Sequence, residues 1–293
     1  MRMRKFTHLK PKTLQEAISL LSQYNGKSKI IAGGTELVNR MKEKLITPEY
    51  VIDITYIPGL DKIEYDVKSG LKIGALCPLI DIECSSLVKE KHDAFARAVH
   101  TIGSVQVRNL GTIGGNLCNA SPSADSAPIL IGLDARVRIF GPAGERVVEL
   151  KDFFTGPGQT VLKSAEILVS IEVPNSPPRS AAVYMKQSLR RAMDLAVVGV
   201  AVVLSLAPDD SLADIRIVLG AVAPTPIRAV KAEALIRGKK LDSGLIREAA
   251  RLASDEAKPI SDVRSSKEYR NDMVEVLTER ALQQTLQQAD NAR

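Results

Sequence analysis

Two short glycine-rich segments constrain this chain more than any other feature, because each follows an apolar run and contains a glycine pair. The first is AGGTEL at residues 32–37, and the second is GTIGGN at residues 111–116. Paired glycines let the main chain approach a ligand that a Cβ atom would push away. Successive free N–H groups in such turns form concave sites for anions. Two such turns in one domain predict a diphosphate that is bound from both sides.

The residues around the first glycine pair predict a strand–turn–helix unit. Thr13 followed by Glu16 is a capping box, after which apolar residues recur at helical spacing. Residues 29–32 are expected to form a short buried strand, and Thr35 is expected to cap a second helix that runs to about Lys44. Helix N-termini attract anions, so a phosphate is expected at this junction.

The sequence pattern changes after a linker-like segment, NSPP, at residues 175–178. Strand-like runs come first and helical patterns follow: strands at 181–186, 195–206 and 215–222, then helices at 227–237, 243–257 and 266–287. The strands therefore do not alternate with helices as a doubly wound sheet requires. Neither glycine segment matches GxGxxG, which disfavours a nicotinamide-binding Rossmann domain.

Charge and hydropathy narrow the possible partners. The net charge of +6 comes from 40 basic and 34 acidic residues that are spread along the chain, and no nucleic-acid-binding motif accompanies it. We therefore expect no nucleic-acid partner. The longest apolar run, residues 195–206, is too short to cross a bilayer, and no signal peptide is predicted. An odd cysteine count without CxxC spacing predicts no disulfide framework or metal cluster and favours the cytoplasm.

Few side chains are suited to catalysis. The histidines are His8, His92 and His100, which are widely separated and lack the spacing of metal ligands. We predict no catalytic residue and no metal site, so a cofactor must supply any chemistry. By residue type alone, Asp125 is either an acceptor for a ribose or ribityl hydroxyl or the N-cap of a helix over residues 126–132. Lys186 is, by residue type alone, a solvated charge.

The chain resembles the FAD-binding, medium subunits of the molybdenum hydroxylases, a family that includes xanthine dehydrogenase and carbon monoxide dehydrogenase. The resemblance follows almost the whole chain and is carried by AGGTEL and by several further segments. These are RNLGTIGGNLCNASPSAD (108–125), TGPG (155–158), EIL (166–168), APTPIR (223–228) and SKEYR (266–270).

The resemblance implies an α+β fold similar to that of vanillyl-alcohol oxidase. Residues 1–176 would form an FAD-binding domain with subdomains of about 1–57 and 58–176. Residues 177–293 would form a C-terminal domain with a three-stranded antiparallel sheet and helices. The order of strands and helices expected from the sequence agrees with this division.

The resemblance also implies which residues contact FAD. Asn116 and Asp125 would contact the ribityl and phosphate region, Ile167 would contact the flavin ring through its main chain, and Lys186 would approach the isoalloxazine. Glu36 stands where the family more often has Asp. The diphosphate would be held by Lys29, Ile30, Ile31, Ala32, Gly33, Gly34, Thr35, Glu36, Gly111, Thr112, Ile113, Gly114 and Gly115.

The function that the resemblance implies is electron transfer within a heteromeric oxidoreductase. FAD would take electrons from 2Fe-2S clusters of a small partner subunit and reduce NAD, quinone or ferredoxin. Substrate hydroxylation would take place on a large molybdopterin subunit, in a dimer of heterotrimers. Two alternatives are open: a stand-alone FAD oxidoreductase of the same fold, such as a relative of UDP-N-acetylenolpyruvoylglucosamine reductase, and a non-catalytic assembly subunit without FAD.

Overall fold

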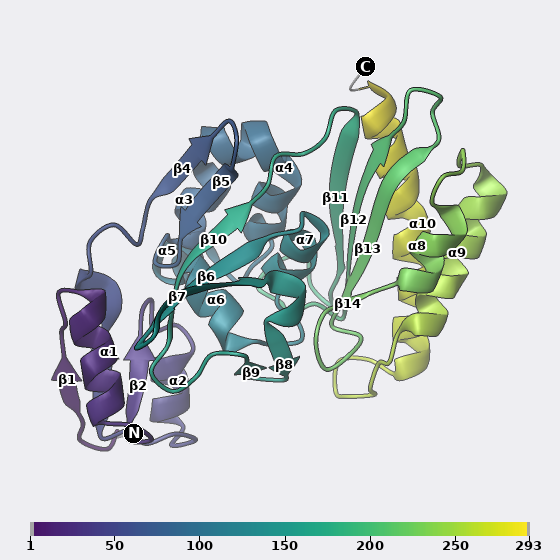
Figure 1. Ribbon diagram of the computed structural model, residues 1–293. Coiled ribbons are helices and arrows are strands. Elements are labelled where there is room, and N and C mark those ends of the chain that lie inside the picture. The colour runs from purple at the N-terminus through teal and green to yellow at the C-terminus, as the bar shows by residue number, and fades with distance from the viewer. Residues whose placement is uncertain (1–2, 292–293) are drawn as a thin grey trace.

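A computed structural model describes residues 3–291 and places four β-sheets in three regions along the molecule (Figure 1). The N-terminal region is a small parallel sheet in the order β1-β3-β2 with two helices. Its elements are β1 (Thr7–Leu9), α1 (Leu14–Gln23), β2 (Ser28–Ile31), α2 (Leu37–Lys42), β3 (Tyr50–Asp53) and the 3-10 turn η1 (Ile54–Tyr56).

The capping box that the sequence predicts opens helix α1. The Thr13 hydroxyl accepts a hydrogen bond from the Glu16 N–H at 3.1 Å, and the Glu16 carboxylate accepts one from the Lys12 N–H at 2.7 Å. Helix α2 differs from the prediction, because it begins after Glu36 and no side chain caps it. The expectation that Thr35 caps this helix is therefore wrong, and Thr35 lies in the turn before the helix.

The middle region is a five-stranded antiparallel sheet in the order β4-β5-β10-β6-β7, with helices packed beside it (Figure 1). Its strands are β4 (Ile63–Asp66), β5 (Gly70–Gly74), β6 (Arg136–Gly141), β7 (Gly144–Glu149) and β10 (Ile167–Val173). Its other elements are α3 (Leu79–Cys84), α4 (Ser86–His100), α5 (Val105–Leu110), α6 (Ile113–Asn119), α7 (Ser126–Gly132), η2 (Leu150–Asp152), β8 (Phe154–Gly156) and β9 (Gln159–Thr160).

The C-terminal region is the antiparallel meander that the sequence predicts, followed by helices. A two-residue strand, β14, extends the three expected strands and occupies the predicted start of the first helix. The elements are β11 (Ser180–Gln187), β12 (Val198–Leu206), β13 (Leu212–Gly220), β14 (Ile227–Arg228), α8 (Val230–Ile236), α9 (Ser243–Glu256) and α10 (Lys267–Asn291).

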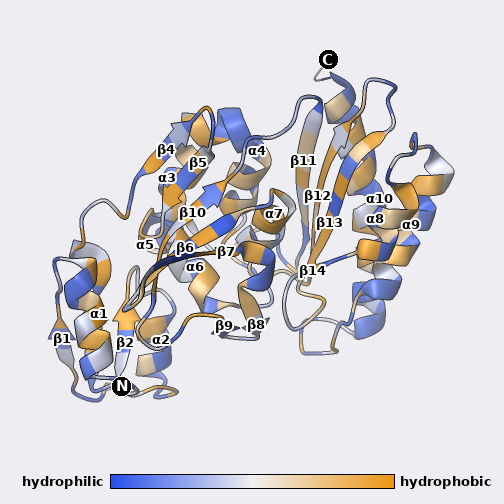
Figure 2. Cartoon of the chain, viewed as in Figure 1, coloured by the Kyte–Doolittle hydropathy of each residue, from blue (hydrophilic) through white to orange (hydrophobic). Residues whose placement is uncertain are grey.

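Strand β12 joins the middle and C-terminal regions into one packed body. Its nine residues are all buried, and it is apolar in Figure 2. Alternate side chains point to opposite faces of a strand. Ala201 and Val203 pack toward helix α7 of the middle region, whereas Val200 and Val202 pack toward helix α10. The C-terminal sheet is thus fixed against helix α7, which follows the second glycine segment and helix α6 in the chain.

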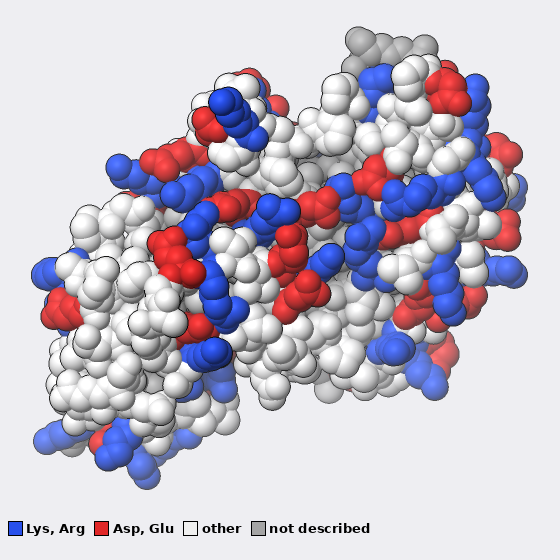
Figure 3. All heavy atoms as spheres, in the orientation of Figure 1, with Lys and Arg blue, Asp and Glu red and all other residues white. Residues whose placement is uncertain are grey.

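Charged side chains on the face shown in Figure 3 are mixed in sign, and many form ion pairs across strands. Arg136 pairs with Glu149 at 2.8 Å, and Arg138 pairs with Glu172 at 2.7 Å. Among the helices in residues 3–291, none is both long enough and apolar enough to cross a membrane.

Candidate functional site: a cleft between the two glycine turns

A cleft of about 810 Å³ lies where the three regions meet. Its walls come from the AGGTEL turn, the GTIGGN segment, residues 121–125, the start of β10 and a loop at residues 190–195. The volume lies in the upper part of the range found for small-molecule and cofactor sites.

The two glycine segments meet main chain against main chain. A Cβ atom on Gly33 would lie 1.8 Å from the Leu110 carbonyl oxygen, so that only glycine fits there. A Cβ atom on Gly111 would lie 3.5 Å from the Thr35 hydroxyl oxygen. Segments that are far apart in the sequence thus form adjacent walls of one cleft, as the paired turns predict.

The first turn provides unused hydrogen-bond donors. Among the described residues, the main-chain N–H groups of Gly33, Gly34 and Thr35 donate to no acceptor in the protein. Gly34 has φ of +71°, a conformation that L-residues rarely adopt, and the turn that it makes lines the cleft. Such a row of main-chain donors suits an anion.

The second glycine segment has a different role, because most of its N–H groups already donate to acceptors within the protein. Ile113 and Gly114 donate to the carbonyls of Cys77 and Ala75 at 3.1 and 2.8 Å. A Cβ atom on Gly114 would lie 2.6 Å from Ala75, so glycine here allows helix α6 to dock closely. Gly115 lies at the cleft wall, where only the Thr112 hydroxyl, at 3.0 Å, is within 4 Å of its Cβ position.

Asn116 and Thr112 complete this wall. The Thr112 hydroxyl caps helix α6 by accepting a hydrogen bond from the Gly115 N–H at 3.1 Å. The Asn116 side-chain oxygen accepts a hydrogen bond from Ser126 at 2.5 Å. Since an amide side chain both accepts and donates, this bond leaves the Asn116 NH₂ group as the donor available to a ligand.

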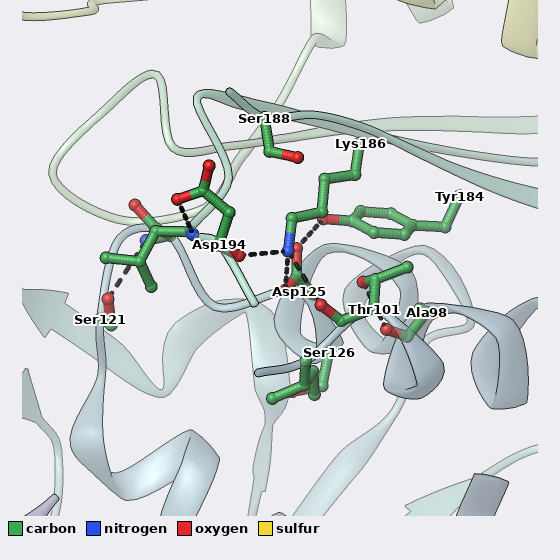
Figure 4. Close-up of polar contacts among 12 residues, drawn as sticks. Ala98, Thr101, Ser121, Asp125, Ser126, Tyr184, Lys186, Ser188 and Asp194 are labelled. Carbon is green, nitrogen blue, oxygen red and sulfur yellow. Dashed lines mark hydrogen bonds and ion pairs between the residues drawn. The ribbon is translucent and has the colours of Figure 1, made fainter. Parts of the chain in front are cut away.

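Asp125 lies at the inner end of the cleft, in a buried network with Lys186 and Tyr184 (Figure 4). Its carboxylate oxygens accept hydrogen bonds from the Lys186 ammonium at 2.9 Å and the Tyr184 hydroxyl at 2.7 Å. Burial raises the pKa of the Asp125 carboxyl, although Lys186 and Tyr184 act in the opposite direction. Asp125 precedes helix α7 but makes no side-chain cap bond, so the N-cap alternative is not observed.

Lys186 also holds a wall of the cleft in place. Besides Asp125, its ammonium donates to the main-chain oxygens of Thr101 at 3.0 Å and Asp194 at 2.8 Å. The three hydrogens of the ammonium are therefore all engaged. Asp194 belongs to the loop at 190–195, so that Lys186 ties this loop to the ends of helices α4 and α7 (Figure 4).

Glu166 fixes the start of strand β10 at the opposite wall. Its carboxylate accepts two hydrogen bonds from Arg146, at 2.9 and 2.7 Å, and one from the Lys163 N–H at 2.8 Å. The Arg146 hydrogen bonds are the main cause that lowers the pKa of Glu166. Ile167, the next residue, is thereby presented to the cleft.

Most of the site residues predicted from the sequence line this cleft. They are Ile30, Ile31, Ala32, Gly33, Gly34, Thr35, Glu36, Gly111, Thr112, Gly114, Gly115, Asn116, Asp125 and Ile167. Three predicted residues lie elsewhere: Lys29 is exposed on β2, Ile113 is in the core, and Lys186 lies behind Asp125.

The sequence did not indicate several cleft residues. Arg40 extends the first wall from helix α2, and Arg190, Met193 and Leu195 belong to the loop that Lys186 holds. Ser121 could have been identified from the repeated small polar residues of SPSAD at residues 121–125. Nothing in the local pattern of residues 190–195 indicated that this segment forms a wall of the cleft. In residues 3–291, no group of three His, Cys, Asp or Glu side chains is placed to hold a metal ion.

Comparison with known proteins agrees with this architecture. A family profile described as the FAD binding domain in molybdopterin dehydrogenase matches residues 4–176, and one described as the CO dehydrogenase flavoprotein C-terminal domain matches residues 183–285. The glyceraldehyde dehydrogenase medium chain of Sulfolobus acidocaldarius is 36% identical over 279 residues, which cover 95% of this chain and 98% of that protein.

Carbon monoxide dehydrogenase of Hydrogenophaga pseudoflava is similar in both sequence and structure. Its medium chain is 34% identical over 278 residues, which cover 95% of this chain and 96% of that protein. A solved structure of that enzyme superposes with a TM-score of 0.93 at 34% identity and covers 97% of this chain and 98% of that chain.

The fold and the cleft define a flavin-binding subunit of an oxidoreductase. The chain belongs to the FAD-binding medium subunits of the molybdenum hydroxylase family, and its cofactor is FAD. The resemblance seen in the sequence and the α+β fold that it implies are both confirmed.

Proposed function

We propose that this chain holds FAD in the cleft between the two glycine turns and works as the electron-transfer subunit of a molybdenum hydroxylase complex. When bound, FAD supplies the redox chemistry, taking electrons from 2Fe-2S clusters of a partner and passing them to an external acceptor. The observation that carries this proposal is the turn at Gly33, Gly34 and Thr35, which lines the cleft and whose N–H groups donate to no acceptor in the described residues.

The residues present fit FAD in both shape and chemistry. The Cβ position of Gly115, at the cleft wall, has only the Thr112 hydroxyl within 4 Å, so the cleft has room for a ligand beside this main chain, and a side chain here would fill this room. The Asn116 amide and the Asp125 carboxylate offer a donor and an acceptor for ribityl hydroxyls further along the cleft. Lys186 holds the Asp125 carboxyl group in place through a hydrogen bond of 2.9 Å, and by family resemblance it also approaches the isoalloxazine.

The proposal extends to partners and organisation. The relatives with medium-chain names support a small 2Fe-2S subunit and a large molybdopterin subunit as partners, which we place in a dimer of heterotrimers in the cytoplasm. The external acceptor would be NAD, quinone or ferredoxin, and organic substrate would react in another subunit. We keep residues 1–176 as the FAD-binding domain, with subdomains of about 1–57 and 58–176, and residues 177–293 as the C-terminal domain.

Flavin binding by the purified full chain tests the proposal. The wild-type protein should be yellow or take up added FAD, and Gly115→Val should bind no FAD while keeping the wild-type circular dichroism spectrum. Its side chain would enter the cleft, where only the Thr112 hydroxyl is close. Gly114→Val is the contrasting variant, because it collides with Ala75 at 2.6 Å and should lower the melting temperature.

A wild-type protein that takes up no FAD would refute the proposal and favour a non-catalytic assembly subunit. Substrate turnover by the isolated chain would instead favour a stand-alone FAD oxidoreductase. Purification from the native source with metal and flavin analysis tests the partners: molybdenum, iron and FAD should be found in one complex.

A further inference from the structure

Four of the six charged side chains that line the cleft in residues 3–291 form ion pairs within the protein. In residues 3–291, each of three cleft-lining carboxylates has a basic partner: Asp125 with Lys186 at 2.9 Å, Glu166 with Arg146 at 2.7 Å, and Asp194 with Arg190 at 3.7 Å. Of the described cleft-lining charges, Glu36 and Arg40 are left without an ion pair.

Arg40 is placed to act on the same ligand as the first glycine turn. It lies on helix α2, and its N–H donates to the Glu36 carbonyl at 3.1 Å, which puts it one turn beyond the free N–H groups. Its side chain is exposed and lines the cleft, and its guanidinium makes no hydrogen bond or ion pair with the described residues. This contrasts with Arg190, which donates to the Met193 carbonyl at 2.7 Å.

We propose that Arg40 binds the diphosphate of FAD and completes the anion site that the Gly33, Gly34 and Thr35 N–H groups begin; this rests on the proposed function. The planar guanidinium matches phosphate oxygens and donates to two of them at once. Without Arg40, the unpaired Glu36 carboxylate would leave this wall negative toward a dianionic ligand. The Arg40 charge therefore offsets the Glu36 carboxylate and adds to the attraction that the free N–H groups provide.

Flavin affinities of Arg40 variants of the full chain test this role. Lys42→Gln is the matched control, because Lys42 is an exposed cation on the same helix that does not line the cleft. Each protein is titrated with FAD at low and high salt and with riboflavin, which lacks phosphate. Arg40→Gln should weaken FAD binding by about tenfold to a hundredfold at low salt, the range for loss of a charged hydrogen bond.

The pattern of losses identifies the contact. The effect of Arg40→Gln should shrink at high salt, because exposed charges are screened, and riboflavin affinity should stay at the wild-type value. Arg40→Lys should lie between the wild type and Arg40→Gln, since it keeps the charge and loses the two-donor geometry. Lys42→Gln should bind FAD like the wild type.

Two results would overturn the role of Arg40: wild-type affinity for FAD in Arg40→Gln, or an equal loss of FAD and riboflavin. The melting temperature of Arg40→Gln should match that of the wild type, which separates lost binding from lost folding. A wild-type chain that binds no FAD refutes the proposed function instead, so that the two failures are distinguishable.

Discussion

Replacing Lys186 with Met would leave the Asp125 carboxylate buried without its cation. The side chains of Lys186 and Asp125 are only 9% and 6% exposed, so water does not replace the lost partner. Removing one member of a buried ion pair typically destabilises a protein by about 3–5 kcal/mol. At about 2–4 °C per kcal/mol for a chain of this size class, the melting temperature should fall by about 6–20 °C.

The loss should depend on pH, and its sign follows from Asp125. Burial already raises the Asp125 pKa, and removal of Lys186 takes away the main opposing influence, so the pKa rises further. A carboxyl with a raised pKa in the folded state favours folding below its unfolded pKa, near 3.9, and this contribution is lost as pH rises through the folded value. Lys186→Met should therefore be closer to the wild type at about pH 5 than at about pH 8.

Thermal unfolding followed by circular dichroism at the two pH values measures both effects. Lys42→Met is the control for loss of an exposed lysine, and the double variant Asp125→Asn/Lys186→Met should recover part of the stability because no charge is left buried. A fall of less than about 2 °C at the higher pH, or an equal fall at both, would refute the reasoning. In the FAD-bound variant, a shifted flavin absorption maximum would support the predicted approach of Lys186 to the isoalloxazine.

Two further predictions concern groups near the cleft. Glu166→Gln removes a carboxylate whose pKa is lowered by its hydrogen bonds to Arg146. The carboxylate therefore stabilises the folded state above the ordinary Glu pKa, and this stabilisation is lost as pH falls through the folded pKa. Urea unfolding of the variant should show a loss of about 1–3 kcal/mol at neutral pH and little loss in acid. The exposed Cys84 should react fast with a thiol-specific disulfide reagent. Cys77 and Cys118 should react slowly, because burial raises their thiol pKa to about 12. Three equally fast thiols would contradict this burial.

The parts of the fold that sequence predicts well are those whose causes are local. The cap at Thr13 depends on Glu16, three residues away, and it forms as expected. The anion cradle depends on consecutive residues around Gly33 and Gly34, whose missing side chains are visible in the sequence. The meander after residue 180 follows from apolar runs that are long enough to be buried on both faces.

The parts that sequence does not predict depend on contacts between distant residues. Asp125 and Lys186 are 61 positions apart, and their residue types favoured a ligand contact or cap for one and solvent for the other. Strand β11 brings them together, and their pairing decides both orientations. Likewise, the two glycine segments look equivalent in sequence, yet docking on Ala75 and Cys77 consumes donors of the second and leaves the first available.

The hydrogen bond from Lys186 to the Asp194 carbonyl has a consequence for redesign of the loop at residues 190–195, which forms a wall of the cleft. A main-chain oxygen is present whatever side chains a loop carries, so the anchorage does not depend on Leu189, Arg191 or Ala192. These positions are exposed, and their identity can be exchanged while the loop stays in register. These exposed positions are therefore suited to substitutions that would bind a chosen redox mediator, while Lys186 keeps the loop in place.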